Sequence, residues 1–179
     1  MTVFGTINTA REIGALFAQT ADKTVANTGT ETSLIGTGQG SVTLPADFFS
    51  VGKTIRFRWL GYNSTTSPAG TLIFRVKLGA STIMATATNT ATNNLANNRV
   101  EIFGEITCRS VGASGTVHGQ GSVIRATAAN AASRWQMVKT STSTVDTTGS
   151  LLFDITVQWG TASASNTMTM TNGILEVFR

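Results

Sequence analysis

The sequence predicts an all-β protein: a jelly-roll-like antiparallel sandwich of about 8–10 strands, preceded by a short N-terminal arm that contains a helix. Three observations favour this fold. Apolar residues alternate with polar ones over most of the chain, and this period of two residues is typical of a half-buried strand. Segments rich in Gly, Asn, Ser and Thr separate these stretches. The length of 179 residues suits one domain with an appendage, so we divide the chain into an arm (1–22) and a β domain (23–179).

The arm differs from the rest of the chain because its apolar residues have helical spacing. Thr9 and Glu12 fit a capping box, in which the threonine hydroxyl accepts a hydrogen bond from an amide of the first turn. A helix of about ten residues is marginal by itself, so this one needs a surface, either its own β domain or a partner. If the surface is a partner, the candidate anchoring residues are Val3, Phe4, Ile7, Ile13, Leu16 and Phe17, the last three at i, i+3 and i+4.

The strongest alternation lies in residues 53–62 and 71–78, where apolar side chains occupy one parity and most cations the other. Like charges directly opposite one another are costly, so something must neutralise the cations. Glu101 and Glu105, on a later strand, would do so through cross-strand salt bridges; an acidic partner or another subunit is the alternative. If the two strands pair as a hairpin, four cations share one sheet face: Arg56, Arg58, Arg75 and Lys77.

Charge is sparse and unevenly distributed along the chain. Charged residues make up 12% of the sequence, about half the usual share, which is typical of a surface that faces other protein. The formal net charge is +4, but residues 48–100 hold six basic and no acidic residues, whereas the remainder holds seven basic and nine acidic ones. The chain is therefore not uniformly basic, and its aromatic residues point away from the cations. We expect no nucleic-acid partner.

No catalytic or cofactor motif stands out. Cys108 and His118 fall on opposite parities of neighbouring strands, so we interpret them as a core thiol and a surface imidazole. One cysteine and one histidine leave too few ligands for a transition metal. Asp154 projects outward from its strand, and the nine acidic residues offer no carboxylate pair for glycoside hydrolysis. We therefore expect no enzyme, no metal site and no cofactor.

The sequence also argues against a phosphate-binding loop, a membrane helix and a signal peptide. Residues 36–40 read GTGQG, but a proline-containing stretch follows instead of a helix, so we predict a flexible loop and not a phosphate-binding one. No uncharged apolar run approaches the ~20 residues of a membrane helix. The N-terminus lacks the basic and apolar regions of a signal peptide. We expect a protein made in the cytoplasm, without a membrane partner.

Residues 150–178 read as two long strands joined by the polar turn GTASASNT. The first of these strands, 151–159, has an apolar residue at every second position, which is a full inward row for a sheet that packs on another sheet. The small residues of the turn suit close approach of backbones. We expect this closing pair to anchor the β domain.

Four phrases of the sequence, in this order and spacing, carry a resemblance: SVTLPADFFSVGKTIRFRWLGY, TLIFRVKLG, GTVHGQG and DITVQWGTASASNTMTMTNGILEVF. The chain resembles a widespread group of virion structural proteins of tailed bacteriophages and prophages over most of residues 23–178. The resemblance implies a non-enzymatic particle component with a jelly-roll-like β body. Such a component is a head decoration, a head fibre or a tail-associated module.

The short arm, which lacks a coiled-coil shaft, favours decoration over a fibre tip. We therefore expect a capsid decoration (cement) protein on the outer surface of the phage head, made in the host cytoplasm. Its expected partners are the major capsid protein and further copies of itself in a homotrimer. The alternative is a head-fibre or tail-associated module that binds a host receptor or glycan through loops such as 89–98 or 163–166.

Overall fold

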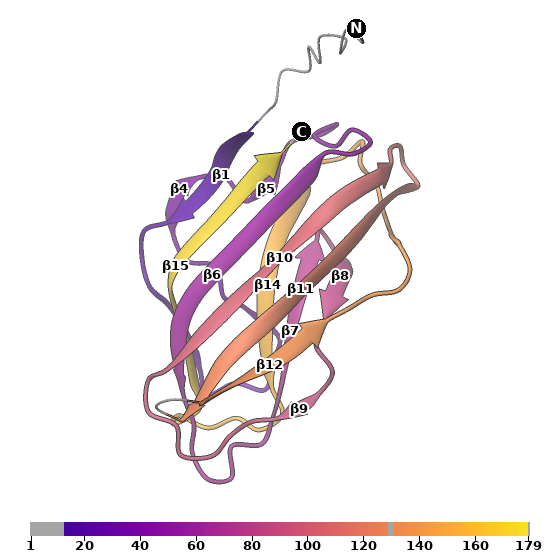
Figure 1. Cartoon of the computed structure of the whole chain (residues 1–179). Coiled ribbons are helices and arrows are strands. Elements are labelled where there is room, and N and C mark those ends of the chain that lie inside the picture. The colour runs from indigo at the N-terminus through magenta and orange to yellow at the C-terminus, as the bar shows by residue number, and fades with distance from the viewer. Residues whose placement is uncertain (1–12, 129–130, 179) are drawn as a thin grey trace, which may run out of the picture.

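The protein is an antiparallel β-sandwich of two sheets, so the predicted all-β fold is confirmed. The computed structural model describes residues 13–128 and 131–178, and these residues contain no helix. They form fifteen strands, of which nine have five residues or more, close to the predicted number; the other six are short. Figure 1 shows the two sheets facing each other, with the long strands of the larger sheet in front.

The larger sheet has nine strands, in the order β12, β11, β10, β6, β15, β1, β4, with β13 also paired to β11 and β2 to β15. Their bounds are β1 (Ile13–Gln19), β2 (Lys23–Ala26), β4 (Gly38–Gly40), β6 (Thr54–Ser64), β10 (Asn98–Ser110), β11 (Gly115–Ala128), β12 (Ala131–Met137), β13 (Ser143–Val145) and β15 (Thr167–Phe178). The smaller sheet has six strands, in the order β3, β14, β7, β8, with β5 also paired to β14 and β9 to β7. Their bounds are β3 (Thr32–Ser33), β5 (Thr43–Leu44), β7 (Thr71–Leu78), β8 (Ser81–Ala85), β9 (Asn89–Thr90) and β14 (Leu151–Trp159).

The core lies between the sheets and follows the alternation of the sequence. Phe57 and Trp59 on β6 are buried, and so is Phe153 on β14, at ring-centroid distances of 5.4 and 5.9 Å from them. Full burial of a large apolar side chain stabilises a fold by about 1.5–3 kcal/mol. The inward row predicted for residues 151–159 is buried from Phe153 to Trp159, with Leu151 half-buried. This strand faces the aromatic row of β6 across the sandwich.

The indole of Trp59 joins three strands of the larger sheet. In the register it lies opposite Gly173 of β15, where an added Cβ would overlap the indole ring. Beyond this glycine, the ring of Phe17 on β1 stacks on the indole at 6.3 Å between centroids. The side-chain Oε1 of Gln19 accepts a hydrogen bond from the indole nitrogen at 2.8 Å, and its Nε2 donates to the carbonyl of Met170 at 2.8 Å. Gly173 thus permits direct contact between β6 and β1 across β15.

Residues 13–19 form strand β1, so the predicted helix is wrong for this part of the arm. The strand pairs with β15 on one side and β4 on the other, with a bulge between Ala15 and Phe17. In this position it covers the edge of β15 and buries Phe17 and Gln19 against Trp59. A short helix gains little by itself, so these tertiary contacts outweigh the local helical spacing.

The candidate anchoring residues therefore have different positions. Ile13 begins β1 opposite Phe178, Leu16 is half-buried against the core, and Phe17 is buried in it. Residues 13–19 thus pack as part of the β body. Five residues named for the arm lie outside the described ranges: Val3, Phe4, Ile7, Thr9 and Glu12.

The glycine-rich segment also differs from expectation, because Gly38–Gly40 forms β4 and pairs with β1 instead of forming a loop. An added Cβ at Gly38 would overlap the ring of Phe17, and one at Gly40 would overlap the carbonyl of Leu16. Gly40 also has a φ of +86°, which other residues rarely adopt. The glycines therefore allow this backbone to lie directly against β1.

The role of Gly173 can be tested by adding one methyl group. Gly173→Ala should lower the free energy of unfolding by about 1–3 kcal/mol, because the methyl overlaps Trp59 and forces the strands apart. Gly149→Ala is the matched control, since nothing lies within 4 Å of a Cβ at that position. Urea unfolding followed by tryptophan fluorescence measures both. If both variants unfold with the same free energy, the packing of Trp59 does not require glycine at position 173.

Candidate functional site on the outer face of the larger sheet

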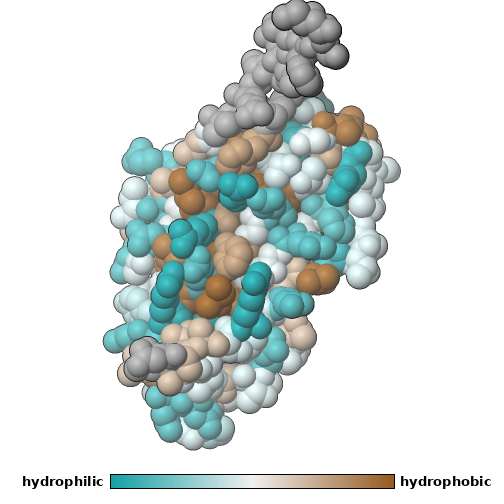
Figure 2. Space-filling view, in the orientation of Figure 1, coloured by the Kyte–Doolittle hydropathy of each residue, from teal (hydrophilic) through white to brown (hydrophobic). Residues whose placement is uncertain are grey.

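The outer face of the larger sheet carries cross-strand ion pairs. Nη2 of Arg56 lies 2.7 Å from Oε1 of Glu105, and Nε of Arg58 lies 2.8 Å from Oε1 of Glu101, which Arg99 also contacts at 2.7 Å. The predicted neutralisation of these arginines by the two glutamates is confirmed. Exposed pairs of this kind each stabilise by less than ~1 kcal/mol. Figure 2 shows the result, with hydrophilic side chains interspersed among separate apolar ones.

Arg75 and Lys77 do not share this face, because residues 53–62 and 71–78 do not pair as a hairpin, which was the condition for one face with four cations. Strand β6 is bonded to β10 and β15 on its two sides, whereas β7 belongs to the smaller sheet. Both cations instead contact Glu31, with N to O distances of 3.4 Å from Arg75 and 3.3 Å from Lys77. The cations of β6 and those of β7 lie on different sheets. They therefore do not come directly opposite one another, as they would in a hairpin.

Two carboxylates lie among these cations of the smaller sheet. Burial raises the pKa of Asp154, although the hydroxyl of Ser33 donates a hydrogen bond to it at 2.6 Å. Burial also acts to raise the pKa of Glu31, but hydrogen bonds from Thr156 and Lys77, together with the charges of Arg75 and Lys77, hold that pKa below its usual value. Glu31 thus pairs with both cations of β7, whereas Asp154 is bonded to Ser33. Nη1 of Arg75 lies in ion-pair contact with Glu31 without forming a hydrogen bond.

Cys108 and His118 lie on opposite faces of the larger sheet, as predicted. Cys108 pairs with Val117 in the register and faces the core at 1% exposure, whereas His118 pairs with Thr107 and is half-buried on the outer face. Burial raises the pKa of the Cys108 thiol. Their side chains therefore cannot form a catalytic dyad. In the described ranges, no group of three or more His, Cys, Asp or Glu could hold a metal ion.

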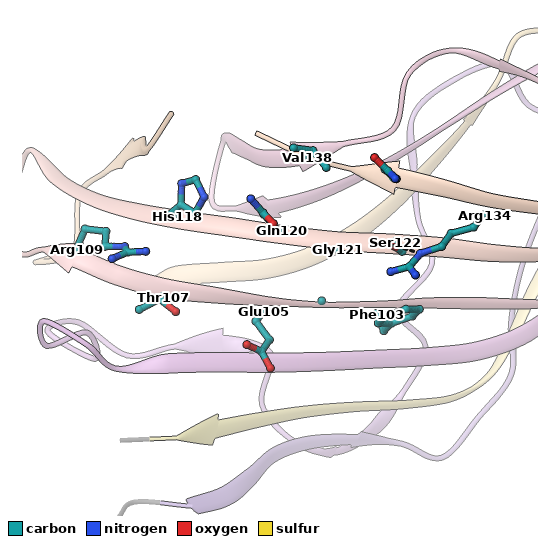
Figure 3. Close-up of a pocket in the computed structure, with 12 residues that line it drawn as sticks. Phe103, Glu105, Thr107, Arg109, His118, Gln120, Gly121, Ser122, Arg134 and Val138 are labelled. Atoms are coloured by element: carbon teal, nitrogen blue, oxygen red, sulfur yellow. Dashed lines mark hydrogen bonds between the residues drawn. The ribbon is translucent and has the colours of Figure 1, made fainter. Parts of the chain in front are cut away.

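A hollow of about 750 Å³ lies on the outer face over β10, β11 and β12, and we call it the outer hollow. Figure 3 shows Arg109 and His118 toward one end of it, Phe103 and Arg134 toward the other, and Gln120 between them. These side chains come from three neighbouring strands. The outer hollow is the candidate functional site of the described chain.

Glycines of the same strands allow close packing on the core side of the sheet. An added Cβ at Gly119 would overlap Met84 of β8, and one at Gly104 would overlap the ring of Phe57. Without a side chain at Gly119, β8 packs closely against β11, and without one at Gly104 the ring of Phe57 fits under β10. The phrase GTVHGQG thus has a packing role.

The outer hollow holds cations without acidic partners. Nε of Arg134 donates to the hydroxyl of Ser122 at 3.0 Å, and its guanidinium lies 5.7 Å from the ring centre of Phe103. Arg109 forms no hydrogen bond or ion pair with any residue of the described ranges. The carboxylate of Glu105 borders the hollow but is bonded to Arg56. Two guanidinium groups are therefore available to an anion.

Sequence reasoning missed this site. It placed the aromatic residues away from the cations, which is true of Phe57 and Trp59 but not of Phe103, which is half-buried on the outer face. The sequence could have placed Phe103 on the outer face, because it has the same parity as Glu101 and Glu105. The sequence could not predict the position of Arg134, because that position depends on how β12 pairs with β11.

Arg125 is a further cation that the sequence analysis did not single out. It is 1% exposed and faces the core, where its guanidinium lies 4.5 Å from the ring centre of Trp135. Burial lowers its pKa to about 10. Because its side chain points into the core, Arg125 contributes to the fold and does not line the outer hollow.

A scan against protein-family models found no matching family, and searches of curated proteins and of solved structures found no match. The described part of the chain contains no helix long and apolar enough to cross a membrane. Function is therefore inferred from the residues and geometry of this chain.

The inward position of Cys108 predicts that its thiol is inert in the folded protein. Labelling with a thiol-reactive disulfide should be at least about 100-fold slower in native buffer than in urea, because the reagent has to wait for local opening of β10. The released chromophore gives the rate. Rapid labelling of the folded protein would contradict the assignment of Cys108 to the core.

Proposed function

We propose that this chain is a non-enzymatic structural protein of a tailed-bacteriophage particle that decorates the outer surface of the head and stabilises the shell. The four sequence phrases that resemble such proteins support this reading. The β-sandwich supports it too, because most of its charged groups on the sheet faces are bonded to one another. A body whose charged groups are paired in this way suits a static structural role better than a role that requires conformational change.

The observation that carries the proposal concerns the end of the sandwich where β1 begins. Ile13 pairs with Phe178 there, so the twelve residues before it join the body at this end. The loops of the same end expose Val51 and Val111, at 69% and 52%. Their position follows from the hydrogen bond between Gly52 and Cys108, near the end of β10, and from the β10–β11 turn. Exposed apolar side chains thus lie at the end of the body where the described chain begins, and the sequence before it contains Val3, Phe4 and Ile7.

The proposed mechanism is physical. The N-terminal segment lies across junctions between major capsid proteins, and the protein binds the assembled shell but not its separated subunits. Such binding stabilises the assembled state by linkage. We propose a homotrimer, because closed symmetry lets several segments reach neighbouring junctions at once. The 12% content of charged residues suits faces that lie against other protein.

One observation favours the second candidate function, a receptor- or glycan-binding module of a head fibre or tail. The outer hollow offers a polar, partly aromatic surface that a shell-bound face does not need. Copy number separates the two candidates. Hundreds of copies per particle, measured by quantitative mass spectrometry against the major capsid protein, support decoration, whereas a few to a few dozen support the fibre or tail module.

Two truncations test the attachment mechanism. Removal of residues 1–12 should leave a folded, oligomeric protein that no longer binds particles, because β1 is kept. Removal of residues 1–22 should cost about 3–5 kcal/mol or abolish folding, because it deletes Phe17 and uncovers Trp59. Co-sedimentation with undecorated heads measures binding, and thermal unfolding measures stability.

A point variant controls for the truncation. Val51→Ser with Val111→Ser should weaken attachment without changing the melting temperature, whereas Val138→Ser, at an exposed valine that follows β12 and borders the outer hollow, should change neither. If the protein lacking residues 1–12 still decorates heads normally, the proposed anchoring segment is wrong.

A further inference from the structure

We propose that the outer hollow binds an anionic oligosaccharide. This inference stands independently of the place that the protein takes on a particle. It rests on the length of the hollow, its hydrogen-bonding groups and its two unpaired cations.

The length of the outer hollow suits a short chain of sugar units. Phe103 and Thr107 lie four residues apart on β10, and their partners Ser122 and His118 lie four apart on β11. At ~3.3 Å per residue the floor is about 13 Å long. The volume of about 750 Å³ falls within the range of ligand sites, which is roughly 300–1,000 Å³.

The lining matches a ligand covered with hydroxyl groups. Amide side chains come from the exposed Gln120 and Gln136, and Thr107 adds a hydroxyl, so donors and acceptors both face the hollow. The ring of Phe103 offers one apolar surface, on which the C–H face of a pyranose can pack. This mixture of one aromatic ring and several neutral polar groups is suited to a saccharide.

The charge of the hollow selects an anionic ligand. Arg109 and Arg134 lie toward opposite ends and have no carboxylate partner within residues 13–128 and 131–178. A guanidinium donates two parallel hydrogen bonds to a carboxylate or phosphate, and these are the stronger, charge-assisted kind. The ligand class is therefore an oligosaccharide that carries carboxylate or phosphate groups.

Other polyanions fit less well. Single-stranded nucleic acid is bound by several stacked aromatic side chains along a continuous cationic track. The hollow has one phenyl ring, Phe103, and one imidazole, His118, which lie toward opposite ends, and Glu105 borders it. An acidic peptide in extended form adds to the free edge of a sheet, whereas this site lies on the face of paired strands.

The test measures binding to matched charged and neutral probes by calorimetry. Carboxylate probes are 3′-sialyllactose and trigalacturonic acid, the phosphate probe is a glycerol-phosphate oligomer, and lactose and maltotriose are the neutral counterparts. At least one anionic probe should bind with a dissociation constant below about 1 mM and at least about ten-fold more tightly than the neutral probes. The preferred probe tells whether the recognised group is a carboxylate or a phosphate.

Charge-matched variants locate the binding. Arg109→Gln and Arg134→Gln should each weaken binding about ten-fold or more, whereas Arg99→Gln, which lies on the same sheet but outside the hollow, should leave it within about two-fold. In the unmodified chain, amide NMR shifts on titration should concentrate at Gln120, Ser122 and Gln136. The proposal is overturned if no anionic probe binds, if neutral probes bind equally, if Arg99→Gln weakens binding as much, or if a single-stranded oligonucleotide binds as tightly.

Discussion

The position of Trp59 is the constraint on which the rest of the fold depends. A buried indole needs a partner for its N–H group, and Gln19 supplies it across a strand that has glycine at the crossing point. The amide of Gln19 is buried in turn, so it requires partners of its own, which are the carbonyl of Met170 and the amide of Gly36. Each requirement fixes another segment, and together they hold β1 in the sheet.

This constraint also determines the end of the body at which the proposed anchoring segment begins. With β1 and β6 both placed beside β15, the first described residue and the last strand end next to each other. The loops with Val51 and Val111 lie at that end as well. An interaction in the centre of the sandwich thereby determines where an N-terminal segment leaves the body, although it makes no contact with any partner.

The core was predictable from the sequence, but the pairing of strands was not. Alternation assigns Phe57 and Trp59 to one face whichever strand lies beside them, so it reveals the face of a strand and not its neighbour. For this reason Arg56 and Arg75 were expected on one face but lie on different sheets. The helical spacing around Leu16 likewise contains no information about the edge of β15, which is covered by a strand and not by a helix. The outer hollow depends on the register of three strands, and only the parity of Phe103 hinted at it.

In a chain with so few charges, the position of each cation is informative. Arg56, Arg58, Arg75 and Lys77 have carboxylate partners, so the sheet faces on which they lie are electrostatically satisfied. Arg109 and Arg134 have no carboxylate partner in the described ranges, and they lie toward opposite ends of the outer hollow. Arg125 has no carboxylate partner either, but it is buried in the core. The position of two exposed guanidinium groups in one hollow is therefore what supports the proposed recognition of an anion.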